Sequence, residues 1–218
     1  MIADEQQARA FVAERCDASA MERLGTLVDA LREENQRQNL VSAASLAHVW
    51  QRHIADSAQL LDHVPRGTLG GALWMDLGAG AGFPGLVIAA MCPEVRVLLV
   101  ESRKRRIEWL DSMIDRLLLS GCSVAGKRLE VLEGPPARVI SARAFAPLDK
   151  LLRLSARFST ADTCWVLPKG RSAALELQGL SGKWQKLFHV EQSVTDPEAA
   201  ILVGRGTVKG QGKGSSAK

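Results

Sequence analysis

The stretch that decides the fold is Trp74-Met75-Asp76-Leu77-Gly78-Ala79-Gly80-Ala81-Gly82-Phe83-Pro84-Gly85. An apolar strand runs into a glycine-rich turn, and Pro84 is a favoured first residue for the helix that follows. Glycines permit positive φ and a close approach of the backbone to a ligand. Free amides at the start of a helix favour an anionic ligand group. The stretch therefore predicts a strand–turn–helix unit that binds a ligand at its turn.

Around this unit, short apolar runs alternate with helical stretches, which is typical of βαβ units and a mostly parallel sheet. The predicted strands are Leu73–Leu77, Val95–Val100, Leu129–Leu132, Val139–Ser141 and Cys164–Leu167, and the predicted helices are Pro84–Met91, Arg103–Ser120 and Leu148–Phe158. We expect Trp184–Ser193 and Ala199–Gly204 to close the sheet as an antiparallel hairpin. The predicted class is α/β, a mostly parallel twisted sheet with helices on both faces.

The N-terminal part follows a helical pattern. Ser19 and Glu22 have capping-box spacing and precede apolar residues at helical intervals. Asn39–Ser42 interrupts this repeat, and a second helix is predicted over Ser45–Val64. We therefore expect a helical extension over residues 1–66.

The formal net charge of +4 comes from the C-terminal end of the chain. The chain has 218 residues, with 28 basic and 24 acidic side chains. Residues 204–218 hold four of the basic side chains and no acidic one, so the remainder is formally neutral. Overall charge is thus weak evidence for nucleic-acid binding. We predict a ligand-binding domain over residues 67–205 and a disordered basic tail over 206–218.

Composition excludes several classes of protein. Hydrophobic residues make up 46% of the chain, enough for a sizeable core. Aromatic residues reach only 5%, with no Tyr, which argues against aromatic platforms for single-stranded nucleic acid. No apolar run approaches the ~18 residues of a membrane span, and the acidic N-terminus lacks a signal peptide, so we expect a cytoplasmic protein. The four Cys and four His residues lack metal-binding spacing, so no metal site is predicted.

The glycine spacing separates two classes of nucleotide-binding enzyme. In the dinucleotide fingerprint GxGxxG/A, the sixth residue is small, but counting from Gly78 it is Phe83. The pattern Asp-x-Gly-x-Gly-x-Gly instead resembles motif I of class I methyltransferases, which have a Rossmann-like fold and bind S-adenosylmethionine. A nicotinamide oxidoreductase is the disfavoured alternative.

Two later segments fit an adenosine ligand. Glu101 follows the predicted second strand, where a carboxylate can accept hydrogen bonds from both ribose hydroxyls; the alternative is an exposed acid beside the basic run Arg103–Arg106. Leu129 and Glu130 lie on the predicted third strand, where resembling proteins place the adenine ring. An ordinary half-buried strand is equally consistent with this second segment.

Three stretches together narrow the resemblance to one family. They are Asn39-Leu40 with Arg52-His53-Ile54-Ala55-Asp56-Ser57, the glycine motif with its Phe83-Pro84-Gly85 ending, and Ser141-Ala142-Arg143-Ala144-Phe145-Ala146 with Leu167-Pro168-Lys169-Gly170 beyond. Residues 25–205 closely resemble the ribosomal RNA small subunit methyltransferase G family, also called glucose-inhibited division protein B. The resemblance implies transfer of a methyl group from S-adenosylmethionine to guanine N7 in the 530 loop of 16S ribosomal RNA.

The resemblance and the motif positions together give a set of expected cofactor-binding residues. They are Asp76, Gly78, Gly80, Gly82, Phe83, Glu101, Leu129, Glu130 and Arg143. We expect Arg143 to bind either the methionyl carboxylate or a substrate phosphate, because its planar fork suits both. Guanine N7 carries an in-plane lone pair, so no general base is expected, and the enzyme would act through proximity, orientation and electrostatics.

Arg52, His53, Lys169 and Arg171 are the candidate contacts to RNA. For Arg103–Arg106, an RNA contact and a solvated helix face are both open. His53 and Asp56 lie one helical turn apart, which favours a role in packing the N-terminal helices. The implied partner is 16S ribosomal RNA or the small ribosomal subunit, and we expect a monomer.

The residues alone leave other activities open. One is a methyltransferase that acts on a small molecule or a protein, although the basic segments and the helical extension disfavour it. Another is a ribosome-binding or assembly factor without turnover, which the intact glycine loop disfavours. Binding of S-adenosylhomocysteine but not of NAD would separate all of these from an oxidoreductase.

Overall fold

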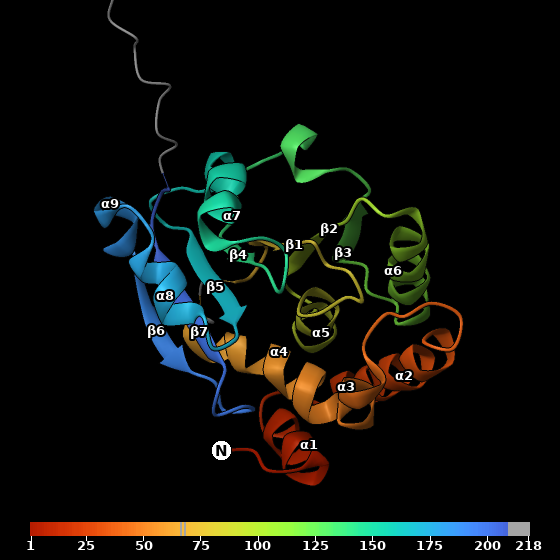
Figure 1. Ribbon diagram of the computed structural model, residues 1–218. Helices are drawn as coiled ribbons and strands as arrows, with labels where there is room; N and C mark the ends of the chain where they lie inside the picture. Colours follow the sequence, from red (N-terminus) through yellow and green to blue (C-terminus); the bar gives the residue numbers. More distant parts are fainter. Residues whose placement is uncertain (66, 68, 209–218) are drawn as a thin grey trace, which may run out of the picture.

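The computed structural model describes residues 1–65, 67 and 69–208. Within these residues, seven strands form one mixed sheet in the order β3-β2-β1-β4-β5-β7-β6 (Figure 1). The first five strands in this order, β3, β2, β1, β4 and β5, run parallel to one another. β7 lies between β5 and β6 and runs antiparallel to both. The predicted α/β class, with its mostly parallel sheet and closing hairpin, is confirmed.

Among the parallel strands, the bounds agree with the sequence patterns to within two residues, except for the third strand. The strands are β1 Leu73–Leu77, β2 Arg96–Val100, β3 Cys122–Ala125, β4 Val139–Ser141, β5 Cys164–Lys169, β6 Phe188–Gln192 and β7 Ala200–Arg205. The predicted strand Leu129–Leu132 is wrong: residues Leu129–Val131 form a single 3-10 turn, η4. The true third strand is an edge strand in which only Cys122 is buried, so its apolar signal is weak.

Side chains that alternate along β1 lie in two different cores. Trp74 packs in one core, while Met75 and Leu77 pack in the other. The first core contains side chains from α1 Glu5–Ala13, α2 Ala18–Glu34, α4 Asp56–Ala58, α5 Gly85–Met91 and α6 Lys104–Arg116, with α3 Ala43–Ala47 packed at its edge. The second contains side chains from α7 Leu148–Ser155, α8 Ala173–Gln178 and α9 Gly182–Gln185. Helices therefore cover both faces of the sheet (Figure 1).

The N-terminal helices pack behind the glycine-rich turn. Buried residues of α2 share a core with α5, the helix that follows that turn. The cap of α2 is Asp17, whose carboxylate accepts the Ala20 N–H at 2.7 Å, so the predicted capping box at Ser19 is wrong. Asn35 fixes the predicted break after α2, because its side-chain oxygen accepts the N–H groups of Leu40 and Val41.

The predicted second N-terminal helix is helical but irregular. A π-helical turn, η1 Trp50–Ala55, leads into α4 and then into a 3-10 turn, η2 Gln59–His63. π-turns are rare and often occur at functional sites. This one carries Arg52 and His53, two of the candidate RNA contacts.

The C-terminal hairpin is shorter than predicted, because Trp184 lies on α9 and β6 begins only at Phe188. The chain then passes beside β5, where the Trp165 indole N–H donates to the Gly206 carbonyl and Val208 is buried. Residues 209–218, most of the predicted tail, lie outside the described residues. No helix in the described part of the chain is long and apolar enough to cross a membrane.

Candidate active site

A cavity of about 450 Å³ opens where β1, β2 and β4 end. Its walls include Gly78, Gly80 and Phe83 of the turn after β1 and Glu101 after β2. Ligands of open α/β sheets bind at this edge, outside the carboxyl ends of the strands. The structure thus brings together the segments that the sequence had marked as a cofactor site.

The backbone of the turn requires its glycines. Gly78, Gly80 and Gly82 all have positive φ, at 69°, 57° and 102°. A Cβ on Gly78 would lie 2.5 Å from Cδ2 of Phe145, and one on Gly82 would lie 2.3 Å from Cδ1 of Leu86. A Cβ on Gly80 would meet its nearest atom only at 3.6 Å. Gly80 therefore leaves its backbone open toward the cavity, whereas Gly78 and Gly82 permit close packing.

Asp76 holds the turn from beneath rather than facing the cavity. Its buried carboxylate accepts the Gly85 N–H at 3.0 Å and the Ser141 hydroxyl at 2.8 Å. These bonds join the end of β1 to the start of α5 and to β4. Burial raises the pKa of Asp76 to about 6, although both hydrogen bonds favour the charged form.

Glu101 lies on the cavity wall and organises the backbone around it. One carboxylate oxygen accepts the Gly80 N–H at 3.1 Å. The other accepts the N–H groups of Ser102 and Arg103, at 2.7 and 2.9 Å. The side chain therefore links the glycine turn to the loop before α6, and its role toward a ribose stays a prediction.

The segment predicted to hold the adenine ring lines the same cavity, although it is the 3-10 turn η4. Leu129 is buried, and Glu130 is exposed beside Arg128 at 3.6 Å. Arg157, from the turn after α7, donates to the carbonyl groups of Leu129 and Leu132 and so fixes the segment. Arg157 was not a candidate from sequence, because nothing local marks its distant acceptors.

A second cavity, of about 1080 Å³, lies beside the first and shares with it the wall formed by residues 143–146. Arg143 is the polar group of this wall. Its guanidinium lies 5.2 Å from the Phe83 ring centroid, 3.5 Å from the Asp56 carboxylate, and donates to the Arg52 carbonyl at 3.3 Å. Burial lowers the pKa of Arg143, and Asp56 counteracts this shift. Arg143 is therefore a fixed charge between two cavities.

His53 also lines the larger cavity. Its ring stacks on Phe83, with centroids 4.8 Å apart. Within the described residues, neither ring nitrogen has a hydrogen-bond partner. Burial, together with Arg143 and Arg52, lowers the pKa of His53 to about 3. The imidazole is therefore neutral at physiological pH.

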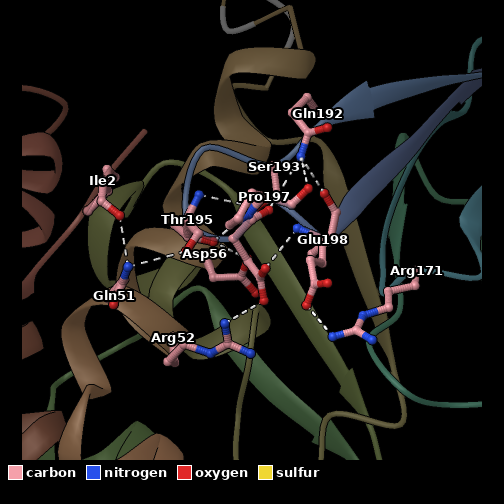
Figure 2. A network of polar contacts seen from close by, with 12 residues as sticks. Ile2, Gln51, Arg52, Asp56, Arg171, Gln192, Ser193, Thr195, Pro197 and Glu198 are labelled. Atoms are coloured by element: carbon pink, nitrogen blue, oxygen red, sulfur yellow. Dashed lines mark hydrogen bonds and ion pairs between the residues drawn. The ribbon is translucent and has the colours of Figure 1, made fainter.

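The remaining basic candidates line the larger cavity, and each is paired with a carboxylate. Arg52 binds Asp196, and Arg171 binds Glu198, in the loop between β6 and β7 (Figure 2). Lys169, at the end of β5, binds Glu176 of α8 at 2.8 Å. All four RNA candidates thus converge on one cavity.

Asp56 lines the larger cavity, whereas its helical spacing with His53 had favoured a role in packing the N-terminal helices. Its carboxylate accepts the Thr195 hydroxyl at 2.9 Å (Figure 2). It also pairs with Arg143 at 3.5 Å. Phe145, which lines both cavities, was likewise not a candidate. Both residues lie inside the quoted motifs, which was the only available signal.

The order of the strands, the glycine turn and the acid after β2 together define a class I methyltransferase with a Rossmann-like fold. Solved structures of low sequence identity share this fold. A variant of MtNAS in complex with S-adenosylmethionine is 18% identical, with a TM-score of 0.54 over 93% of this chain and 84% of its own. A precorrin-6Y methyltransferase from Geobacter metallireducens is 10% identical, with a TM-score of 0.52 over 77% and 91%.

Sequence comparison narrows the class further. Residues 20–201 match the family described as GidB, rRNA small subunit methyltransferase G. A ribosomal RNA small subunit methyltransferase G from Erythrobacter litoralis is 74% identical over 96% of this chain and 100% of its own length. One from Novosphingobium aromaticivorans is 57% identical over 92% and 88%. The chain belongs to the rRNA small subunit methyltransferase G family, whose cofactor is S-adenosylmethionine.

Proposed function

We propose that the protein transfers a methyl group from S-adenosylmethionine to guanine N7 in the 530 loop of 16S ribosomal RNA. The observation that carries this proposal is the pair of cavities that meet at the wall of residues 143–146 in a member of this family. The smaller cavity has the features of a nucleoside-binding site. The larger one has room for a nucleotide of the acceptor.

The residues of the smaller cavity fit the cofactor. Gly80 offers open backbone, and the Glu101 carboxylate beside it is an acceptor suited to ribose hydroxyls. We assign Leu129 and Glu130 to the adenine end, and Phe83 and Arg143 to the methionyl end. Asp76 and Gly82 act indirectly, because they fix the shape of the turn.

The reaction asks for positioning rather than proton transfer. The cofactor supplies an activated methyl group with its leaving group already in place. Guanine N7 has its lone pair in the plane of the ring, so no proton has to be removed first. Neutral His53 and the restrained Arg143 form a preorganised wall for the acceptor base. The chemistry therefore needs no general base from the chain.

We further propose that the acceptor is 16S ribosomal RNA, free or in the small subunit, and that Arg52, His53, Lys169 and Arg171 surround the target nucleotide. These residues line the cavity that adjoins the cofactor site. The protein would act as a monomer in the cytoplasm, where the ribosomal subunits are assembled.

The test is methyl transfer from labelled S-adenosylmethionine to 16S RNA or small subunits that lack the modification. Borohydride and aniline cleavage then locates 7-methylguanosine. We expect a single cleavage in the 530 loop, and none with Gly78→Asp, whose side chain would collide with Phe145. No incorporation into RNA or subunits, despite measured binding of S-adenosylhomocysteine, would overturn the proposal.

A further inference from the structure

The two adjoining cavities differ sharply in charge. The larger cavity is lined by four cations and four carboxylates, so its formal charge is zero with His53 neutral. The smaller cavity is lined by six cations and only two carboxylates, a formal excess of four positive charges. S-adenosylmethionine itself carries a net positive charge, because its sulfonium and amino groups outnumber its carboxylate. The excess therefore does not serve the cofactor.

Four of these cations form a group that we call the basic rim: Arg103, Lys127, Arg128 and Lys150. All four are exposed. Among the described residues, Arg103, Lys127 and Lys150 form no ion pair, and Arg128 has only the loose contact with Glu130. The other two cations of this cavity, Arg106 and Arg143, are engaged with backbone carbonyls of Leu40 and Arg52. The rim thus presents unneutralised charge to solvent.

The rim comes from three separate elements that the sheet brings together. Arg103 precedes α6, Lys127 and Arg128 follow β3, and Lys150 lies on α7. Each element follows the carboxyl end of a parallel strand, so the cations gather at the same edge as the cofactor cavity. Such an arrangement suits a polyanion that passes over the mouth of this cavity.

We propose that the basic rim binds the phosphates of the RNA strand next to the target nucleotide, while the charge-balanced larger cavity receives the uncharged base. This inference rests on the proposed function and names the surface that the acceptor uses. Free positive charge attracts phosphates, whereas a base is held by hydrogen bonds and apolar contacts to its edges and faces, which paired polar side chains can provide. Because Arg52, Lys169 and Arg171 are already paired with carboxylates, they contribute little to the salt dependence of binding.

The test is the affinity of the full chain for an unmodified 16S RNA transcript, measured between about 50 and 200 mM salt. Each of Lys127→Gln and Lys150→Gln should reduce the slope of log affinity against log salt by roughly one. The loss of one phosphate contact also lowers the affinity itself: near 0.1 M salt, each substitution should reduce it roughly fivefold to eightfold. The double variant should show both reductions added.

Two control variants each remove one positive charge outside the basic rim. Lys183→Gln removes an exposed lysine from α9, beside β6 at the opposite edge of the sheet (Figure 1). Arg171→Gln removes a cation of the larger cavity that is paired with Glu198. Both should keep the wild-type slope. If Arg171→Gln reduced the salt slope and the rim variants did not, phosphates would be bound by the larger cavity, and the proposal would be overturned.

Three further measurements separate a role of the rim in RNA binding from other roles. Weaker binding of S-adenosylhomocysteine by the rim variants, with an unchanged RNA slope, would assign the cations to the cofactor instead. Weaker binding to small subunits alone would assign the rim to a ribosomal protein. If the wild-type chain methylates no RNA, the proposed function fails; if it methylates RNA and the rim variants keep its salt slope, only the rim proposal fails.

Discussion

The contact between Gly78 and Phe145 makes a quantitative prediction about the glycine turn. Alanine at position 78 would adopt φ near 69°, which costs a residue with a Cβ roughly 1–2 kcal/mol. Its Cβ would also lie 2.5 Å from Cδ2 of Phe145, so the ring must move. Overpacking of this kind costs about 1–3 kcal/mol. We therefore expect Gly78→Ala to lower the free energy of unfolding by about 2–5 kcal/mol.

Gly80→Ala is the matched control for backbone strain. Its φ of 57° carries a similar conformational cost, but its Cβ would have no atom closer than 3.6 Å. We expect a loss of only about 1–2 kcal/mol from this substitution. Urea unfolding followed by circular dichroism measures both losses at one pH and one salt concentration.

A double-mutant cycle isolates the clash. In a Phe145→Ala background, the ring that Gly78→Ala would displace is gone, so the cost of Gly78→Ala should fall to that of Gly80→Ala. An equal cost of Gly78→Ala with and without the Phe145 ring would refute the reasoning. It would mean that the loop of residues 142–147 moves away at no cost, and that Gly78 is required for its φ alone.

Three other predictions follow from charges in the site. Burial raises the pKa of Asp76 to about 6, so between its ordinary value near 3.8 and pH 6 only the folded protein holds this proton, and stability falls as pH rises. Burial lowers the pKa of His53 to about 3, so between pH 3 and 6.5 only the unfolded chain holds that proton, and stability rises with pH. In the wild type the two effects oppose each other, so the free energy of unfolding, measured in urea between pH 4 and 6, should change little. It should rise with pH in Asp76→Asn and fall with pH in His53→Gln. Arg143→Lys keeps the charge but loses the planar fork that meets both Asp56 and the Arg52 carbonyl, so methyl transfer should fall at least roughly tenfold; wild-type turnover would show that charge alone suffices. Glu101→Gln weakens acceptance of three backbone N–H groups and removes the proposed ribose contact, so calorimetry should show roughly tenfold to hundredfold weaker binding of S-adenosylhomocysteine; unchanged affinity would limit Glu101 to a structural role.

The sequence was most informative where local chemistry determines the backbone. β1 and α5 agree with prediction within one residue, because an apolar strand, positive-φ glycines and a proline mark the same boundaries. The third strand was misplaced, since the Leu-Glu-Val-Leu run that begins with η4 looks more strand-like than Cys122–Ala125, in which only Cys122 is buried. Periodicity reports burial, and this edge strand is weakly buried.

The pairing of charges could not be predicted, because each pair joins distant parts of the chain. Arg52 and Asp196 are 144 residues apart, and only the return of the β6–β7 loop to η1 brings them together. The same holds for the basic rim: the sequence left an RNA contact open for Arg103 and did not mark Lys127, Arg128 or Lys150. A list of basic residues in a sequence therefore does not separate free charge from neutralised charge, and that difference decides which of them can bind phosphate.

The two cavities are built from different parts of the chain, and this has a consequence for specificity. The proposed cofactor side is formed by loops that follow the parallel strands, whose side chains pack in the two cores. The proposed acceptor side depends on η1, on α4 and on the β6–β7 loop, which the hydrogen bond between Asp56 of α4 and Thr195 joins to α4. Arg143 pairs with that same Asp56 and forms part of both cavities. Changes in the N-terminal segment or the hairpin should therefore alter the choice and placement of the acceptor before they alter cofactor affinity, and Arg143 is the point where the two effects meet.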